Sequence, residues 1–161
     1  MIVVVMGVAG AGKSTVAEAL AAQLDLPFIE ADDFHSPEAE AKTKRGEPMT
    51  DDDRWPWLDR LNAELRARPG GAVLACSALA ERHRARLLDG VDDARLVHLT
   101  GDPALLRSRL EARKGPAGPE LLASQLATLE PPADAITVDV ATPLDEVIST
   151  VLGALRGAER L

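Results

Sequence analysis

The sequence has little of what disulfide-rich, membrane-spanning or nucleic-acid-binding proteins need. Its one cysteine, Cys76, excludes an internal disulfide framework and is typical of a reducing compartment. No apolar run approaches the roughly 18–20 residues of a membrane span. The net charge of −8 disfavours an extended nucleic-acid surface, because phosphate backbones are bound by clustered positive charge. We therefore expect a cytoplasmic protein with neither nucleic-acid nor membrane partners.

What is present indicates an ordinary globular chain. At 161 residues, with 46% apolar and 27% charged residues, the length and composition predict a single domain, residues 1–161. The apolar run "IVVVM" near the N-terminus has no basic residue before it and a glycine-rich turn after it, so we expect a strand there rather than a secretory leader. The sequence contains no internal repeat.

Short apolar runs alternate with helical patterns along the chain. The runs cover residues 2–8, 27–32, 72–78, 95–100 and 136–140, and most are continuous, which is typical of strands buried on both faces of a parallel sheet. Apolar residues at helical spacing lie between or after them: Val16, Leu20 and Leu24, then Leu144, Val147, Ile148, Val151, Leu152 and Leu155. The pattern predicts an α/β fold.

Two segments interrupt this alternation. Residues 33–70 are long and mostly helical, and we expect a substrate-binding insertion there. Thr50 is the expected cap of a helix whose apolar residues, Trp57, Leu58, Leu61 and Leu65, belong to the core. A basic helix then runs into "GPAGP" at residues 115–119, and we expect a lid at about 107–125.

The stretch "GVAGAGKST" is the most informative motif. It has the full Gly-x-x-x-x-Gly-Lys-Ser pattern of a phosphate-binding loop, placed between an expected strand and an expected helix. Glycines let the main chain approach a phosphate closely, and successive amide groups form an anion-binding concavity. The motif predicts a nucleoside triphosphate site made by Gly7, Val8, Ala9, Gly10, Ala11, Gly12, Lys13, Ser14 and Thr15. Lys13 is expected on the β- and γ-phosphates and Ser14 on Mg²⁺.

Acidic residues follow the second expected strand in "EADDFH". Ligands of open α/β sheets gather at the carboxyl ends of strands, so these side chains are expected beside the phosphate loop. Asp32 or Asp33 could accept a hydrogen bond from a substrate hydroxyl, and Glu30 or Asp32 could hold Mg²⁺ through water. His35 is a further substrate-binding candidate, and a turn residue is its alternative.

The third expected strand ends in "VLACSAL" without an aspartate. Ser77 occupies that place and is a candidate for contact with substrate, metal or water. We expect Cys76 to be a small buried apolar residue rather than a nucleophile, because the local sequence offers no partner base.

Four arginines are candidates for binding anions. Arg54 in the insertion and Arg84 after the third strand are expected to bind a substrate carboxylate, with a surface ion pair as the alternative for each. Arg109 and Arg113 are expected to close over the triphosphate from the lid, while some of Arg107, Arg109, Arg113 and Lys114 belong to a solvated helix face.

Taken in order, "MGVAGAGKST", "ADDFHSP", "GEPMTDDDRWPWL", "CSAL", "RLEARKG" and "SQLATLEPP" resemble the gluconate kinase family. The resemblance covers nearly the whole chain, and "GEPMTDDDRWPWL" and "SQLATLEPP" are its most specific parts. It implies the P-loop kinase fold, with a five-stranded parallel sheet in the order 2-3-1-4-5. It also implies transfer of the γ-phosphoryl group of ATP to the 6-hydroxyl of D-gluconate, and members are often homodimers.

The chain departs from the family pattern at Ala80, His83, Pro116 and Ala117, where the family has other residues. Three alternatives therefore stay open beside gluconate. The substrate could be another sugar acid or polyol, it could be a shikimate-like compound, or the chain could be a binding-only, nucleotide-dependent regulator. The absence of an Asn-Lys-x-Asp sequence argues against a GTPase switch.

Overall fold

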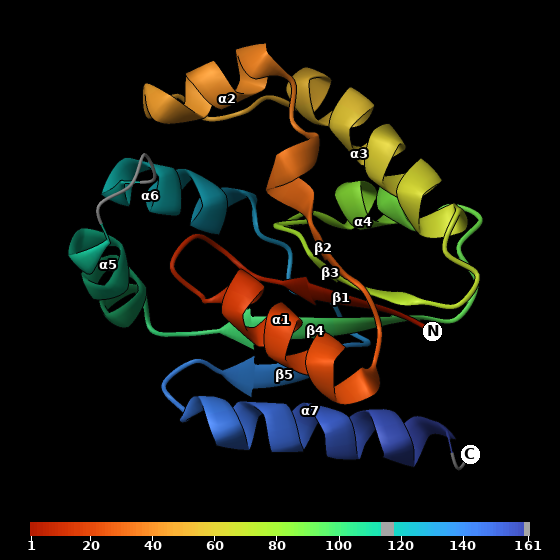
Figure 1. Ribbon diagram of the computed structural model, residues 1–161. Coiled ribbons are helices and arrows are strands. Elements are labelled where there is room, and N and C mark those ends of the chain that lie inside the picture. The colour runs from red at the N-terminus through yellow and green to blue at the C-terminus, as the bar shows by residue number, and fades with distance from the viewer. Residues whose placement is uncertain (114–117, 160–161) are drawn as a thin grey trace.

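The computed structural model describes residues 1–113 and 118–159. Within them, the chain forms one sheet from strands β1 (Ile2–Met6), β2 (Phe28–Glu30), β3 (Ala72–Ala75), β4 (Ala94–Thr100) and β5 (Ile136–Asp139). The strands are all parallel and lie in the order β2-β3-β1-β4-β5, which confirms the predicted sheet (Figure 1).

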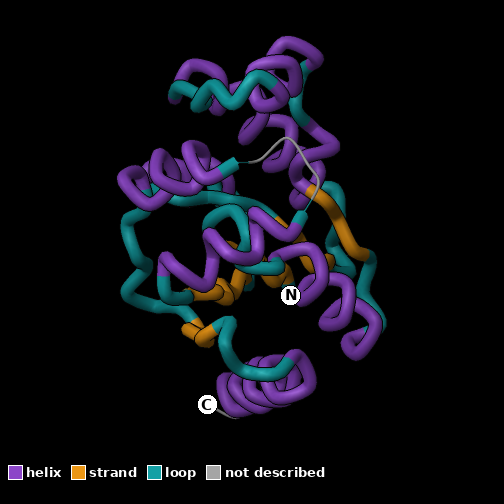
Figure 2. The backbone as a smooth tube through the Cα atoms, turned by 90° about the vertical axis from the view of Figure 1, so that its left-hand side faces the viewer, coloured by secondary structure: helices purple, strands orange, loops and turns teal. Residues whose placement is uncertain are grey.

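Helices connect the strands and cover both faces of the sheet. They are α1 (Lys13–Leu24), α2 (Pro37–Lys44), α3 (Asp51–Arg66), α4 (Glu81–Leu87), α5 (Pro103–Ala112), α6 (Pro119–Thr128) and α7 (Leu144–Glu159), with a short 3₁₀ helix, η1 (Ala31–Phe34). Figure 2 shows α7 below the strands and the helices of residues 37–66 at the opposite end of the molecule. None of the helices in the described residues combines the length and apolar character that a membrane crossing requires.

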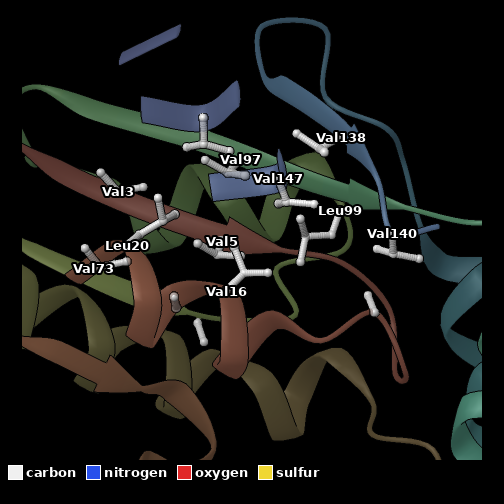
Figure 3. Close-up of a cluster of buried hydrophobic side chains, with 14 of the residues drawn as sticks. Val3, Val5, Val16, Leu20, Val73, Val97, Leu99, Val138, Val140 and Val147 are labelled. Carbon is white, nitrogen blue, oxygen red and sulfur yellow. The ribbon is translucent and has the colours of Figure 1, made fainter. Parts of the chain in front are cut away.

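The pleat of the strands divides the core into two clusters. In β1, Val3 and Val5 belong to the cluster that also contains buried residues of α1 and α7, while Ile2 and Val4 belong to the cluster formed with α3 and α4. Successive side chains of a strand point to opposite faces, so a continuous apolar run supplies both clusters. Figure 3 shows the first cluster, in which Leu20 packs beside strand valines.

The first three strands end earlier than their apolar runs suggest. β1 ends at Met6, β2 at Glu30 and β3 at Ala75, two or three residues before the predicted ends at 8, 32 and 78. Beyond these points the main chain leaves the sheet for the phosphate loop, for η1 and for the turn before α4. The residues that follow each strand therefore lie at its carboxyl end rather than in a ladder.

The start of α3 is fixed by its first residues. The Thr50 side chain accepts from the Asp53 amide, and the Asp53 carboxylate accepts from the Thr50 amide, which confirms Thr50 as the cap. The four predicted core residues of this helix are all buried: Trp57, Leu58, Leu61 and Leu65. The helix is thus anchored on the sheet while its first turn, which carries Arg54, stays near the carboxyl ends of the strands.

Helix α5 begins at a capped residue, and the expected apolar stripe of α7 holds with one exception. Asp102 caps α5, since its carboxylate accepts from the Ala104 amide, and Pro103 takes the first helical position. In α7 the apolar stripe from Val147 to Leu155 packs on the core, but Leu144 at its start is exposed.

Candidate active site

A cavity of about 930 Å³ opens at the carboxyl ends of the strands. Its walls come from the phosphate loop, the end of β2, α2, the start of α3, the turn after β3 and the facing ends of α5 and α6. In Figure 1 these segments surround the left-hand ends of the strands. The side chains and amides in this cavity are the candidate active site.

The phosphate loop connects β1 to α1, as the motif predicts. Gly10 and Gly12 have φ angles of 86° and 84°, which residues with a Cβ rarely adopt. A Cβ added at Gly10 would also lie 2.8 Å from the Leu106 carbonyl oxygen. These angles lead directly into the amino end of α1, where free amide groups and the helix dipole favour an anion.

Lys13 is the first residue of α1 and lines the cavity. Its ammonium group donates to the Val8 carbonyl oxygen at 3.1 Å. Burial lowers the pKa of Lys13, and the nearby Asp32 and Glu30 carboxylates oppose that shift. A desolvated ammonium held beside a phosphate loop is suited to polyphosphate binding.

Ser14, the predicted metal ligand, is hydrogen-bonded to the end of β2. Its hydroxyl donates to Glu30 Oε2, and Glu30 Oε1 accepts from the Asp32 amide at 3.4 Å. Burial raises the pKa of the Glu30 carboxyl, and the Ser14 hydroxyl opposes this effect. Of the two acids proposed to assist the metal, Glu30 is the one that touches Ser14.

These oxygen atoms fit a magnesium ion. A hydroxyl and two carboxylates are hard ligands, and Mg²⁺ is usually held by one or two carboxylates together with waters and substrate phosphates. No cluster of three or more histidine, cysteine or acidic ligands occurs in residues 1–113 and 118–159. A metal in this cavity would therefore depend on the triphosphate for part of its coordination.

Asp32 and His35 lie together on the wall of the cavity. His35 Nε2 is 3.7 Å from Asp32 Oδ1, and the imidazole lowers the pKa of the Asp32 carboxyl. The His35 ring stacks on Trp57 with centroids 4.3 Å apart, and Trp57 Nε1 donates to the Ala31 carbonyl oxygen. Asp32 is thus an ionised acceptor beside an imidazole that is itself fixed by stacking on Trp57.

Asp33 does not accompany Asp32 into the cavity. Its side chain is exposed and is not among the lining residues. Consecutive residues of a 3₁₀ helix point about 120° apart, so η1 turns Asp33 away when Asp32 faces the cavity. The prediction of Asp33 as a substrate-binding residue is not supported by this placement.

Arg54 lines the cavity from the first turn of α3, and its side chain is 14% exposed. Its Nη1 donates to Asp51 Oδ1 at 3.2 Å. Ser77, in the turn after β3, lines the same cavity. Both residues line the candidate active site, and their contacts with a substrate stay predictions.

The prediction for Arg84 is wrong. Its side chain is buried, and its guanidinium donates to the carbonyl oxygens of Ala78, Leu79 and Glu130 at 2.9, 2.9 and 2.7 Å. It does not line the cavity. Arg84 instead satisfies main-chain carbonyls around the turn after β3, so its function is structural.

Two arginines of the predicted lid face the cavity. Arg109 lines it and donates from Nη2 to the Val140 carbonyl oxygen at 2.7 Å, and Arg113 lines it from just beyond the end of α5. Arg107 lines a separate shallow hollow between α5 and α6. Lys114, Pro116 and Ala117 lie outside the described residues.

Several lining residues were not predicted from the sequence. They include Glu40, Thr43, Lys44, Met49 and Gln125. Gln125 is the most specific, because its side-chain oxygen accepts from the Ala9 amide at 2.6 Å and so joins α6 to the phosphate loop. Its place in "SQLATLEPP" was the available signal.

Cys76 has the predicted character of a buried hydrophobe. It belongs to the cluster formed with α3 and α4, and burial raises the pKa of its thiol to about 12. A thiol with that pKa is protonated at neutral pH and is not a nucleophile.

Comparisons with known proteins show which proteins this chain resembles. A family model described as an AAA domain matches residues 2–132. The chain is 36% identical to the thermoresistant gluconokinase of Escherichia coli, over 96% of the chain and 93% of that protein. It is 45% identical to a gluconokinase of Gluconobacter oxydans, over 81% and 76%. The crystal structure of a gluconokinase from Sinorhizobium meliloti superposes with a TM-score of 0.89 at 42% identity, over 99% of this chain and 94% of that one.

Proposed function

The chain belongs to the gluconokinase family, and we propose that it transfers the γ-phosphoryl group of ATP to the 6-hydroxyl of D-gluconate, giving 6-phospho-D-gluconate. One observation carries this proposal. The phosphate loop, the acceptor carboxylate of Asp32 and the guanidinium of Arg54 all line the same cavity of about 930 Å³. A triphosphate and a hydroxy acid can therefore meet in one site.

The residues divide into those that hold the donor and those that hold the acceptor. The loop amides and Lys13 hold the β- and γ-phosphates, and Arg109 and Arg113 contribute positive charge from α5. Phosphoryl transfer depends on positioning and on neutralising charge more than on covalent catalysis, and these groups supply both.

On the acceptor side, Arg54 pairs with the carboxylate of gluconate. Asp32 accepts the hydrogen bond of the 6-hydroxyl and orients its oxygen for in-line attack on the γ-phosphorus. The lowered pKa keeps Asp32 ionised as a hydrogen-bond acceptor. The hydroxyl becomes more acidic as the new P–O bond forms, and Asp32 takes its proton at that stage. His35 and Ser77 lie where they can bind the other hydroxyls.

Mg²⁺ is the proposed metal, with Ser14 as its protein ligand and Glu30 as the carboxylate that holds it through water. When bound, the ion neutralises charge on the phosphate oxygens. Glu30 keeps the Ser14 hydroxyl oriented through their hydrogen bond.

The insertion and the lid keep their proposed functions. Residues 33–70 contribute Arg54, His35 and Lys44 to the cavity wall, which supports an acceptor-binding insertion. Residues of the region 107–125 face the phosphate loop from α5 and α6, which supports a lid. We also propose a cytoplasmic location, for which the single thiol is the support, and a homodimer, for which the family resemblance is the support. Sedimentation would test the dimer.

A substrate panel tests the proposed function. ADP release is measured with ATP and Mg²⁺ in the presence of gluconate, related sugar acids, polyols, shikimate or no acceptor. We expect release to depend on gluconate, and to fall by at least about 100-fold in Lys13→Met. A rate of ADP release that does not change with millimolar gluconate would contradict the proposal. Faster turnover of another acceptor would make that compound, rather than gluconate, the proposed substrate. ATP binding without any turnover would favour a regulator.

A further inference from the structure

Arg54 is held by a carboxylate that other side chains hold in turn. Asp51 is the first residue of α3, and its Oδ1 accepts from Arg54 Nη1 at 3.2 Å and lies 2.8 Å from His83 Nε2. Arg82 donates to both carboxylate oxygens, at 2.6 and 3.2 Å. The Asp51 carboxylate therefore joins the start of α3 to α4.

His83 is buried and its tautomer is set by its surroundings. Its side chain is 1% exposed, and Nδ1 accepts from the Ala80 amide at 3.2 Å. Burial lowers the pKa of the imidazole, so it is neutral near pH 7 and carries a single ring proton. Since Nδ1 is an acceptor, the proton is on Nε2 and is donated to Asp51.

We propose that Asp51 and His83 are positioning residues for Arg54: His83 fixes the Asp51 carboxylate, and Asp51 aims the Arg54 guanidinium into the cavity. This inference rests on the proposed function, in which Arg54 binds the acceptor carboxylate. A long arginine side chain loses rotamer entropy when it binds, and a fixed partner reduces that loss before the substrate arrives. His83 thus influences acceptor affinity, although it is not among the residues that line the cavity.

A simpler structural function for each residue makes a different prediction. Asp51, an acidic residue in the first turn of α3, interacts favourably with the helix dipole. The imidazole of His83 accepts from the Ala80 amide and so caps α4. Either function would change stability and leave the acceptor Michaelis constant unchanged. Because Nδ1 of His83 contacts the Ala80 amide and Nε2 contacts Asp51, substitutions that keep only one contact separate capping from positioning.

The test compares His83→Asn with His83→Gln. An asparagine amide oxygen lies near the position of Nδ1 and retains the Ala80 contact, whereas a glutamine amide nitrogen reaches the position of Nε2 and retains the Asp51 contact. We expect His83→Asn and Asp51→Asn to raise the KM for gluconate about tenfold with kcat nearly unchanged, and His83→Gln to stay within about threefold of the wild type.

Asp59→Asn is the matched control. Asp59 accepts from Arg86 at 2.7 and 2.9 Å, so this variant also breaks an ion pair between α3 and α4 but does not touch Arg54. We expect it to leave KM unchanged. In an Arg54→Ala background, Asp51→Asn should raise KM no further, because the residue through which it acts is gone.

A second readout does not depend on turnover. The ¹⁵N order parameter of the Arg54 Nε–H group is measured in each variant, and we expect it to fall in Asp51→Asn and His83→Asn only. Lack of turnover with gluconate in the wild type would contradict the proposed function, while the order parameters would still decide the positioning. Unchanged order and KM in Asp51→Asn, or a larger effect of His83→Gln than of His83→Asn, would overturn the inference.

Discussion

At the scale of single residues, the partners of each guanidinium decide what it does. Arg54 lines the cavity, and within the described part of the chain its guanidinium donates to one carboxylate, which leaves most of its donors available to a ligand there. Arg84 donates to three main-chain carbonyl oxygens and is buried. The sequence presents both as basic residues near the expected substrate region, and only the packing of α4 on the turn after β3 separates them.

Substitution of the two arginines should affect different properties, acceptor binding for Arg54 and stability for Arg84. Arg54→Ala is expected to weaken acceptor binding by about 2–4 kcal/mol, because the ion pair forms in a partly desolvated site. Arg84→Met should lower the free energy of unfolding by about 2 kcal/mol or more, since it leaves buried carbonyl oxygens without donors. Acceptor KM and urea unfolding measured on both variants check this. An acceptor KM that rises only in Arg84→Met would reverse the assignment.

Glu30 gives the site a pH dependence with a defined sign. Its raised pKa means that it keeps its proton to a higher pH than an ordinary glutamic acid, whose value is 4.5. As pH falls from neutral, the Glu30 carboxylate that supports Mg²⁺ is therefore protonated before ordinary carboxylates are. We expect the apparent affinity for Mg²⁺ to weaken on that acid limb and Glu30→Gln to abolish the dependence. Asp33→Asn, a variant outside the cavity, should keep the pH dependence of the wild type. If Glu30→Gln had the same pH profile as the wild type, Glu30 would not be the carboxylate that supports Mg²⁺.

The choice between neighbouring acids is also a question of local geometry. "EADDFH" marks where the strand ends and predicts acids beside the phosphate loop, which the structure places there as Glu30 and Asp32. The sequence could not choose between Asp32 and Asp33, because the choice depends on the 3₁₀ turn of η1. Gln125 was missed for a similar reason, since its partner Ala9 is 116 residues away in the chain.

At the scale of elements, the first turn of α3 both stabilises the fold and carries a residue of the proposed acceptor site. Asp53 closes the capping box with Thr50 and also accepts from Lys42 of α2 at 2.6 Å. The Lys42 ammonium is the main cause that lowers the pKa of Asp53 to about 2. This carboxylate therefore joins α2 to α3 and fixes the residue that precedes Arg54.

Acid should remove the contribution of Asp53 to stability. A carboxyl whose pKa is 3.8 when unfolded and about 2 when folded stabilises the protein fully above pH 3.8, and the effect disappears as pH falls through about 2. We expect Asp53→Asn to be less stable than the wild type at pH 7 and nearly equal to it near pH 2. Asp52→Asn, its exposed neighbour, serves as control. A difference independent of pH in urea titrations would contradict this.

The ends of elements were the least predictable part of the fold. Apolar runs predict which segments enter the sheet, but Val8 is apolar and lies in the phosphate loop, and Ala78 is apolar and lies in a turn. Both are buried without being in a strand. Hydrophobicity reports burial, whereas the end of a strand is decided by where hydrogen bonding to neighbouring strands stops.

At the scale of the whole molecule, one sheet separates two apolar clusters and places the site at its edge. Continuous apolar strands predict a sheet covered on both faces, and the structure confirms this. Alternation of strands and helices does not determine the strand order. The order β2-β3-β1-β4-β5 was implied by the family resemblance and is confirmed.

The two clusters should unfold together. Leu20 of α1 and Leu61 of α3 are fully buried on opposite faces of the sheet. Leu20→Ala and Leu61→Ala are each expected to lower the free energy of unfolding by about 3 kcal/mol. Because both faces share the same strands, circular dichroism and tryptophan fluorescence should report one coincident transition in each variant. An early separate transition of α3 in Leu61→Ala would show that the faces are independent.

The central claim is that one cavity brings the γ-phosphorus of ATP to the terminal hydroxyl of gluconate. The most direct measurement is ³¹P NMR of the product formed from ATP, Mg²⁺ and gluconate. We predict a new phosphomonoester signal split by two equivalent or near-equivalent protons, as a phosphate on the CH₂ of C6 requires, growing in step with ADP. Inorganic phosphate as the sole product, or a signal coupled to a single proton, would contradict the account.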